Sequence, residues 1–235
     1  MHMQQHLPDG PDGLLRYDMG AGVSAFSPLR DAALPYPVLQ AHQVHGDRVA
    51  VVTSPAVTRD DLQGTDAIVT SIPGLAVAAR TADCIPVLLY DPVGRAVAAV
   101  HAGWKGTVIK IVQKTLRVMK EHAGTAAGNV RAVIGPGIGP DSFQVGPEVA
   151  DAFRAAGFPM DALLHDEGAR VPGTMQGGLH INLWAANAWL LRTAGVPDKQ
   201  ILVSGIDTYQ RNDLFFSARR EGASCGRIIN VIRLD

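Results

Sequence analysis

Short apolar runs alternate with longer amphipathic segments along most of the chain. Runs rich in Val and Ile and bounded by turn residues predict strands, and these runs cover residues 48–54, 75–80, 85–90, 96–101, 130–135, 200–206 and 227–234. Segments with apolar residues at helical spacing lie between them, at residues 106–124, 146–157 and 182–195. This alternation predicts an α/β fold in which helices pack on one or more sheets.

The ends of the predicted helices carry capping signals. Gly124 closes the first helix, where a left-handed cap residue is expected, and Asn182 is a suitable N-cap for the third. The apolar face of the first helix contains Val108, Val112, Thr115, Leu116 and Met119. No linker, low-complexity tract or internal repeat interrupts the pattern, so we expect a single domain over residues 1–235 with residues 1–12 as a loose N-terminal arm.

Charge and composition narrow the class of partner. The chain has 21 Lys and Arg against 22 Asp and Glu, and the basic residues are dispersed, which argues against nucleic acid and membrane surfaces as partners. No apolar run approaches the ~18 residues of a membrane span, and the first residues lack the pattern of a signal peptide. We therefore expect a cytoplasmic protein with a small-molecule substrate, in which Cys84 and Cys225 are reduced.

A predicted hairpin brings a cysteine and a histidine to the same end. The turn Asp91-Pro92-Val93-Gly94 lies between the strands at 85–90 and 96–101. A two-residue loop would place Cys84 opposite His101, with Cβ atoms roughly 4.5–5.5 Å apart, and a bulge at Gly94 would place it opposite Ala102 instead. Either register predicts a thiol beside an imidazole.

The stretch AHQVHGDRV supplies a third ligand, because His42 and His45 come just before another predicted strand. Two His and one Cys bind a divalent metal and leave a fourth position open, which is the catalytic pattern for zinc. Copper accepts the same set, but the absence of His-x-His pairs argues against a trinuclear copper cluster, so we place zinc first. The structural alternatives are a buried core thiol at Cys84 and a solvated turn at the histidines.

Other candidate residues have simpler interpretations. Cys225 is interpreted as a core thiol. IGPGIGP at 134–140 lacks the Gly-Lys-Ser/Thr of a phosphate loop, so it is interpreted as a rigid loop in a pocket wall. The remaining histidines are interpreted as surface or structural residues: His2, His6, His122, His165 and His180.

Five segments together resemble one bacterial family. HQVHGDRV, RTADCIPVLLYDP, AVAAVHAGWKGT, IGPGIGPDSFQVGPEV and DLFFSARREGASCGR resemble the YfiH/YlmD family, described as laccase-like polyphenol oxidases and as purine nucleoside phosphorylases. The resemblance implies an αββα-type fold of layered mixed sheets related to cytotoxic necrotising toxins. It also implies a metal held by His45, Cys84 and His101. Two departures are Met19, where the family has an Arg that would help to hold an anion, and Asp207, where many relatives carry Cys.

The leading hypothesis from this resemblance is a zinc-dependent purine nucleoside enzyme. Members are expected to phosphorolyse adenosine, inosine, guanosine and methylthioadenosine, and to deaminate adenosine by activating a water on the metal. Arg80 and Lys105 are candidates to hold phosphate, and Gln43 to contact substrate. Asp83 would orient a ligand imidazole or act as a general base, or would cap a turn.

Three further hypotheses use the same residues. A metal-free cysteine hydrolase or amidase would use His101 to deprotonate Cys84 and act on a cell-wall precursor. A copper-dependent polyphenol oxidase and a non-catalytic metal-binding module are the others. In HAGWKGT, Gly103 and Gly106 are expected to turn the backbone into a helix whose first amides point at the site, with Trp104 and Lys105 at the pocket rim.

Overall fold

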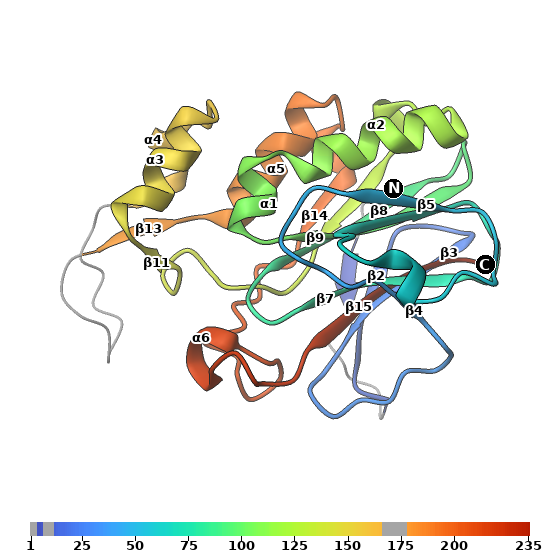
Figure 1. Cartoon of the computed structure of the whole chain (residues 1–235), viewed down its shortest axis with the longest axis horizontal. Coiled ribbons are helices and arrows are strands. Elements are labelled where there is room, and N and C mark those ends of the chain that lie inside the picture. Colours follow the sequence, from blue (N-terminus) through green and yellow to red (C-terminus); the bar gives the residue numbers. More distant parts are fainter. Residues whose placement is uncertain (1–3, 7–11, 166–177) are drawn as a thin grey trace.

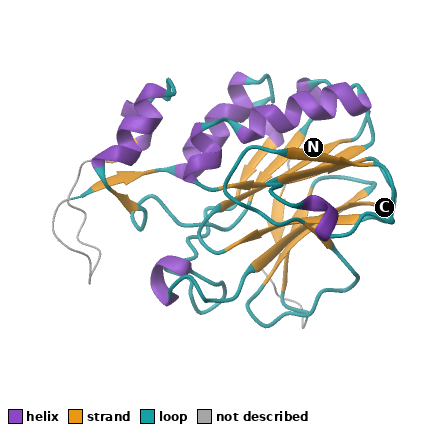
Figure 2. Ribbon diagram, viewed as in Figure 1, coloured by secondary structure: helices purple, strands orange, loops and turns teal. Residues whose placement is uncertain are grey.

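The computed structural model describes residues 4–6, 12–165 and 178–235. Its centre consists of two six-stranded sheets packed face to face, and helices cover the outer face of one of them (Figure 1). Figure 2 shows the longer helices gathered on that side, while the opposite sheet is bordered mainly by loops and short helical turns. The α/β class with layered mixed sheets is confirmed.

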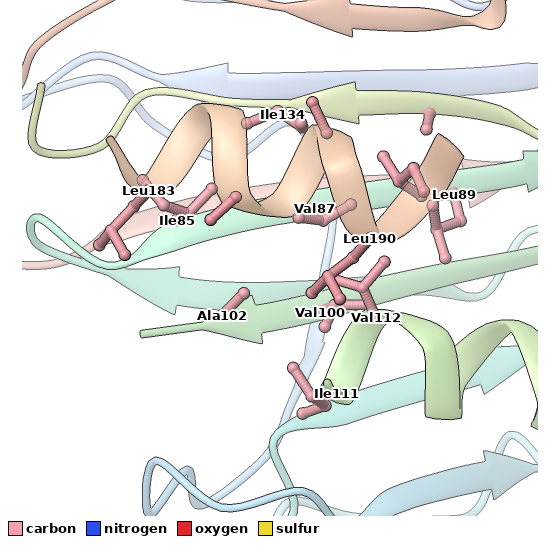
Figure 3. Close-up of a cluster of buried hydrophobic side chains, with 14 of the residues drawn as sticks. Ile85, Val87, Leu89, Val100, Ala102, Ile111, Val112, Ile134, Leu183 and Leu190 are labelled. Carbon is pink, nitrogen blue, oxygen red and sulfur yellow. The ribbon is translucent and has the colours of Figure 1, made fainter. Parts of the chain in front are cut away.

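The helix-covered sheet has the strand order β14-β10-β8-β9-β6-β5. Its strands are β5 (Val49–Val52), β6 (Ala67–Thr70), β8 (Ile85–Asp91), β9 (Ala96–Ala102), β10 (Arg131–Ile134) and β14 (Ile201–Val203). The helices on it are α1 (Trp104–Val108), α2 (Ile111–Ala123) and α5 (Leu183–Thr193). Figure 3 shows Val87, Leu89 and Val100 of the sheet packed with Val112 of α2 and Leu190 of α5.

The second sheet has the order β1-β2-β3-β15-β7-β4. Its strands are β1 (Gln4–His6), β2 (Leu14–Asp18), β3 (Val23–Pro28), β4 (Leu39–Gln40), β7 (Ala76–Thr81) and β15 (Ile228–Leu234). Strand β8 shows why the central strands are apolar throughout: Val87 and Leu89 face the helices, whereas Leu88 and Tyr90 face the second sheet. A strand buried on both faces has no polar alternation.

Smaller elements flank these layers. A three-stranded sheet consists of β11 (Gln144–Val145), β12 (Leu164–His165) and β13 (Leu179–Ile181). The other α-helices are α3 (Pro147–Ala155), α4 (Met160–Leu163) and α6 (Ala218–Glu221). Short 3-10 turns occur at Asp60–Leu62, Ala127–Asn129 and Asp198–Gln200. None of the helices in the described ranges has the length and apolar character needed to cross a membrane.

All seven predicted strands are present, and the predicted helices need one correction. The segment 106–124 forms two helices, because Lys110 adopts a left-handed conformation (φ 62°) between α1 and α2. Gly124 is the expected left-handed C-cap, and the Asn182 side chain accepts the Ala185 N–H as an N-cap. The expected N-terminal arm lies largely outside the described residues, although Gln4–His6 pair with β2.

The predicted register of the β8–β9 hairpin is wrong in both of its forms. Asp91 pairs with Ala96 and Pro86 pairs with His101, so the loop contains four residues, 92–95. Arg95 supplies a positive φ of 49° that closes this longer turn. Cys84 therefore lies just before the paired part of β8 rather than opposite His101.

Candidate functional site

Three side chains from separate segments of the chain meet at one end of the two sheets. Cys84 lies where the chain passes from β7 in one sheet to β8 in the other, His101 lies near the end of β9, and His45 lies in the loop between β4 and β5. Their ligand atoms all lie within 4.8 Å of one another. One sulfur and two imidazole nitrogens fit a divalent metal. His42 is not in this cluster: its Nε2 lies 3.4 Å from Asp60 Oδ1.

The backbone is strained at one candidate ligand and at the residue before another. In the described residues, four non-glycine residues have a positive φ, and His45 (62°) and Asp83 (83°), the neighbour of Cys84, are two of them. Such conformations cost of order 1–3 kcal/mol and cluster at functional sites. One of the two is a candidate ligand and the other adjoins one, which favours a functional site over a buried core cluster.

Gly103 is required for space rather than for flexibility. Its φ of −65° and ψ of 172° are open to any residue. A Cβ at Gly103 would lie 3.0 Å from Cys84 Sγ and 3.2 Å from the Cδ2 of His45, so two candidate ligands pack directly over it. Gly106 lies inside α1, where a Cβ would make ordinary contacts at 3.4 Å or more. The expected double hinge is therefore corrected to one close approach at Gly103.

A buried carboxylate, Asp66, binds two of the three candidate ligands. Its Oδ1 lies 2.8 Å from His101 Nδ1 and accepts the backbone N–H of His45 at 2.9 Å. Its Oδ2 accepts the N–H groups of Gly46 (2.9 Å) and Val44 (3.2 Å). Sequence reasoning missed Asp66 because the short strand β6 that follows it, AIVT, was not predicted.

The cluster shifts the pKa values of its own members. Burial alone would raise the pKa of the Cys84 thiol, but hydrogen bonds from His101 and His45 lower it to about 6. Burial lowers the pKa of His101, whereas its hydrogen bonds to Asp66 and Cys84 raise it to about 9. A thiolate paired with imidazole is the form of cysteine that binds metals and attacks electrophiles.

Asp83 does not orient a ligand imidazole, which was the first role predicted for it. Its Oδ1 accepts the Thr208 hydroxyl at 2.8 Å, and its Oδ2 accepts the Arg219 N–H at 2.6 Å in the first turn of α6. The carboxylate that orients an imidazole is Asp66 instead. Asp83 caps a turn, the third role considered, and ties the backbone before Cys84 to the C-terminal region.

A cavity of about 840 Å³ opens beside the cluster. Four arginines line it, while Asp83 is the one carboxylate among the lining residues that the structure describes. These arginines are Arg59, Arg80, Arg219 and Arg227. The apolar part of the lining consists mainly of Trp104, Ile138, Phe143 and Leu183. The cavity thus combines a possible metal site, positive charge and aromatic surface.

Two of these arginines, Arg59 and Arg227, act on a third, Arg80. Desolvation, together with the charges of Arg59 and Arg227, lowers the pKa of Arg80. The guanidinium groups of Arg59 and Arg80 donate no hydrogen bond to any other residue in the described ranges, and Arg80 Nε is buried without a partner. Of these three arginines, the sequence analysis selected only Arg80, because Arg59 and Arg227 come close to it only in the fold.

Gln43 and Lys105, which were both expected to contact substrate, differ in their position relative to the cavity. Gln43 lines the cavity, and its side chain bonds to the backbone of Arg80: its Nε2 donates to the carbonyl and its Oε1 accepts the N–H, both at 2.8 Å. Gln43 thus holds the loop that contains His45 against β7. Lys105 is exposed, 5.6 Å from the Trp104 ring centroid, and is not among the lining residues, whereas Trp104 is.

The two departures from the family pattern are both accommodated. Met19 is buried between the sheets and does not line the cavity. Asp207 accepts hydrogen bonds from the Ser142 hydroxyl (2.6 Å) and the Tyr209 N–H (2.9 Å). Ile138 in the 134–140 loop lines the cavity, and its N–H donates to the Asp83 carbonyl at 2.8 Å, so this loop is part of the wall.

Comparison with known proteins gives consistent matches. The family model described as Multi-copper polyphenol oxidoreductase laccase matches residues 27–235. A purine nucleoside phosphorylase of Bacteroides thetaiotaomicron is 44% identical over 173 residues, which span 74% of this chain and 62% of that protein. Adenosine deaminase RL5, from an unknown prokaryotic organism, is 39% identical over 83% of this chain and 74% of its own length. The crystal structure of Bacillus licheniformis hypothetical protein YfiH has a TM-score of 0.85, at 29% identity over 98% of this chain and 99% of its own.

Proposed function

Because the chain belongs to the multi-copper polyphenol oxidoreductase laccase family, in which several relatives are named purine nucleoside phosphorylases, we propose that it is a metal-dependent purine nucleoside phosphorylase. Its proposed substrates are inorganic phosphate and adenosine, inosine, guanosine or methylthioadenosine. In this reaction a phosphate oxygen attacks C1′ of the ribose, and the purine leaves with a proton.

The observation that carries this proposal is the arginine group beside the three candidate ligands. Arg59 and Arg227 both repel the partly desolvated Arg80, and the guanidiniums of Arg59 and Arg80 lack partners in the described part of the chain. A dianion relieves that repulsion, because guanidinium groups bind phosphate with paired, charge-assisted hydrogen bonds. A deaminase does not need an anion at this position, whereas a phosphorylase does.

The remaining side chains fit the other parts of the substrate. His45, Cys84 and His101 would hold a divalent metal, proposed to be zinc, which when bound supplies Lewis-acid chemistry. Trp104 and Phe143 offer aromatic surface for a purine ring. Asp83 keeps the backbone before Cys84 in its strained conformation, and Gln43 fixes the backbone of Arg80.

Adenosine deamination is the second candidate. It is favoured by the relative named adenosine deaminase RL5 and by the ligand set, because three protein ligands leave a position open for water. Oxidation of polyphenols, which the family description names, would require copper in the same site.

Metal analysis and product analysis together test these candidates. Protein purified without chelator is assayed for zinc and copper, and adenosine and inosine are incubated with and without phosphate before chromatography. Free purine that appears only with phosphate supports the phosphorylase, and inosine formed from adenosine without phosphate supports the deaminase. Metal-free protein that is inactivated by iodoacetamide at Cys84 would instead support the cysteine hydrolase. Bound zinc with no turnover would support a binding module.

A further inference from the structure

We propose that Asp66 is the residue that positions the metal centre: its single carboxylate sets both the tautomer of His101 and the conformation of the loop that contains His45. The inference rests on the proposed function only in taking His45, Cys84 and His101 as metal ligands. It concerns a residue that lies outside the candidate ligand set and does not line the cavity.

The carboxylate is saturated by donors from the site. Each of its oxygens receives two: His101 Nδ1 and the His45 N–H at Oδ1, and the Gly46 and Val44 N–H groups at Oδ2. Three consecutive amides thus converge on one acceptor, which fits a loop held around a carboxylate. Because His45 has a positive φ of 62°, these bonds also offset the strain in that loop.

The backbone of Asp66 holds His101 from the other side. The Asp66 carbonyl accepts the His101 N–H at 2.8 Å, and the next residue, Ala67, pairs with Val100 in the β6–β9 ladder. Asp66 N–H donates to the Arg48 carbonyl at 3.0 Å. Side chain and main chain of one buried residue (2% exposed) therefore fix His101 relative to the sheet.

The chemistry of the carboxylate decides the tautomer. An ionised carboxylate only accepts hydrogen bonds, so Nδ1 of His101 carries the proton and Nε2 is left free to bind a metal. An asparagine cannot reproduce this arrangement. In either orientation its NH2 group would face two N–H donors: those of His45 and His101, or those of Val44 and Gly46.

No other described carboxylate takes this role. Asp83 is engaged by Thr208 and by the amide of Arg219. Asp47, in the same loop as His45, forms an ion pair with Lys114 on α2. Asp60 approaches His42, which lies outside the ligand cluster.

The test compares Asp66→Asn with Asp91→Asn in zinc titrations of chelator-treated protein. Asp91 is also buried and accepts the Val93 N–H at 2.9 Å, but it lies at the far end of the β8–β9 hairpin from His101. Loss of a partner that orients a metal ligand typically lowers metal affinity by about 10- to 100-fold. We expect that loss for Asp66→Asn and less than a ~2-fold change for the control, since only the first variant changes a ligand's partner.

A double-mutant cycle separates positioning from general loss of structure. If Asp66 acts through the ligands, Asp66→Asn should lower zinc affinity several-fold less in a His101→Ala background than in the wild-type chain. Equal losses in both backgrounds would overturn the tautomer part of the proposal. Wild-type zinc affinity in Asp66→Asn would overturn it altogether, whereas a wild-type chain that binds no metal would overturn the proposed function instead.

A measurement on the unmodified chain covers the case in which Asp66→Asn does not fold. In the zinc-loaded wild-type protein, ¹⁵N NMR of His101 should show a protonated Nδ1 and a metal-bound Nε2. Metal bound at Nδ1 would contradict the hydrogen bond to Asp66 and overturn the inference.

Discussion

The two walls of the cavity differ in how their polar groups are satisfied. On the ligand wall, His101 and the amides around His45 bond to Asp66, and the Cys84 sulfur lies within 4.8 Å of a ring nitrogen of each histidine. On the arginine wall, the guanidiniums of Arg59 and Arg80 donate to no other residue in the part of the chain that is described. The first wall is organised by the protein itself, whereas the second has free donors for a ligand.

The walls also differ in where they come from. On the ligand wall, His101 lies near the end of β9 and Cys84 lies where the chain crosses between the sheets, while His45 comes from the β4–β5 loop. Much of the arginine wall comes from connections, with Arg59 before a 3-10 turn and Arg227 before β15. Separate construction implies separate functions, so damage to one wall should spare the other.

The largest expected effect follows from removing a ligand of the first wall. Cys84→Ser should lower zinc affinity and phosphorolysis by more than the ~10- to 100-fold that loss of an outer partner costs. The reason is that a serine hydroxyl does not readily ionise to become an anionic ligand. Metal analysis and phosphate-dependent release of purine measure the two effects.

Thermal stabilisation of the protein by phosphate shows whether the arginine wall is intact in this variant. The arginine wall does not depend on the thiol, so phosphate should raise the melting temperature of Cys84→Ser as much as that of the wild-type chain. Full zinc occupancy in the variant would show that another group holds the metal. Loss of the phosphate effect would show that the two walls are one unit.

The second prediction removes a guanidinium. A hydrogen bond to a charged group contributes about 1.5–3 kcal/mol, so Arg80→Gln should raise the KM for phosphate by about 10- to 100-fold. Zinc content should stay unchanged. Arg154→Gln is the matched control, because Arg154 is an exposed arginine on α3 that pairs with Asp151. A fall in zinc content with Arg80→Gln would contradict the separation of the walls.

Sequence patterns predicted the layers of the fold better than the site's details. Runs of Val and Ile marked seven strands, and the signal is continuous in β8 and β9 because these strands are buried on both faces. The strand 67–70 was missed because it has only four residues, and the strands 14–18 and 23–28 were missed because their sequences, LLRYD and VSAFSP, mix polar and apolar residues. The break at Lys110 has no local signal in the sequence.

The same limit applies to the site. The grouping of Cys84 with His101 was predicted from the hairpin although its register was wrong, because both registers place them at one end. Asp66, Arg59 and Arg227 are distant in sequence from these residues and meet them only through the packing of the sheets. Pairing over such distances cannot be read from one sequence.

The third prediction tests the close packing of the ligands with a pair of glycines. A methyl group at Gly103 would lie 3.0 Å from Cys84 Sγ and 3.2 Å from His45 Cδ2, so both ligands must shift. Overpacking costs about 1–3 kcal/mol, and Gly103→Ala should lower zinc affinity by about tenfold. Gly106→Ala should bind zinc normally and unfold at a slightly higher temperature, because alanine favours a helix by about 1 kcal/mol over glycine. Equal zinc affinities in the two variants would show that the ligands are not tightly packed.

The smallest expected effect concerns Lys105, which sequence reasoning placed at the phosphate. Its side chain is exposed, its ammonium lies over the Trp104 ring and it does not line the cavity, so it belongs to neither wall. A solvated lysine contributes little to a bound anion because water and salt screen its charge. Lys105→Gln should therefore change the KM for phosphate by less than about twofold at physiological salt. Steady-state kinetics at several phosphate concentrations, with Arg80→Gln measured alongside, make the comparison direct: if Lys105→Gln raises the KM as much as Arg80→Gln does, then Lys105 reaches the anion after all, and the positive wall extends to α1.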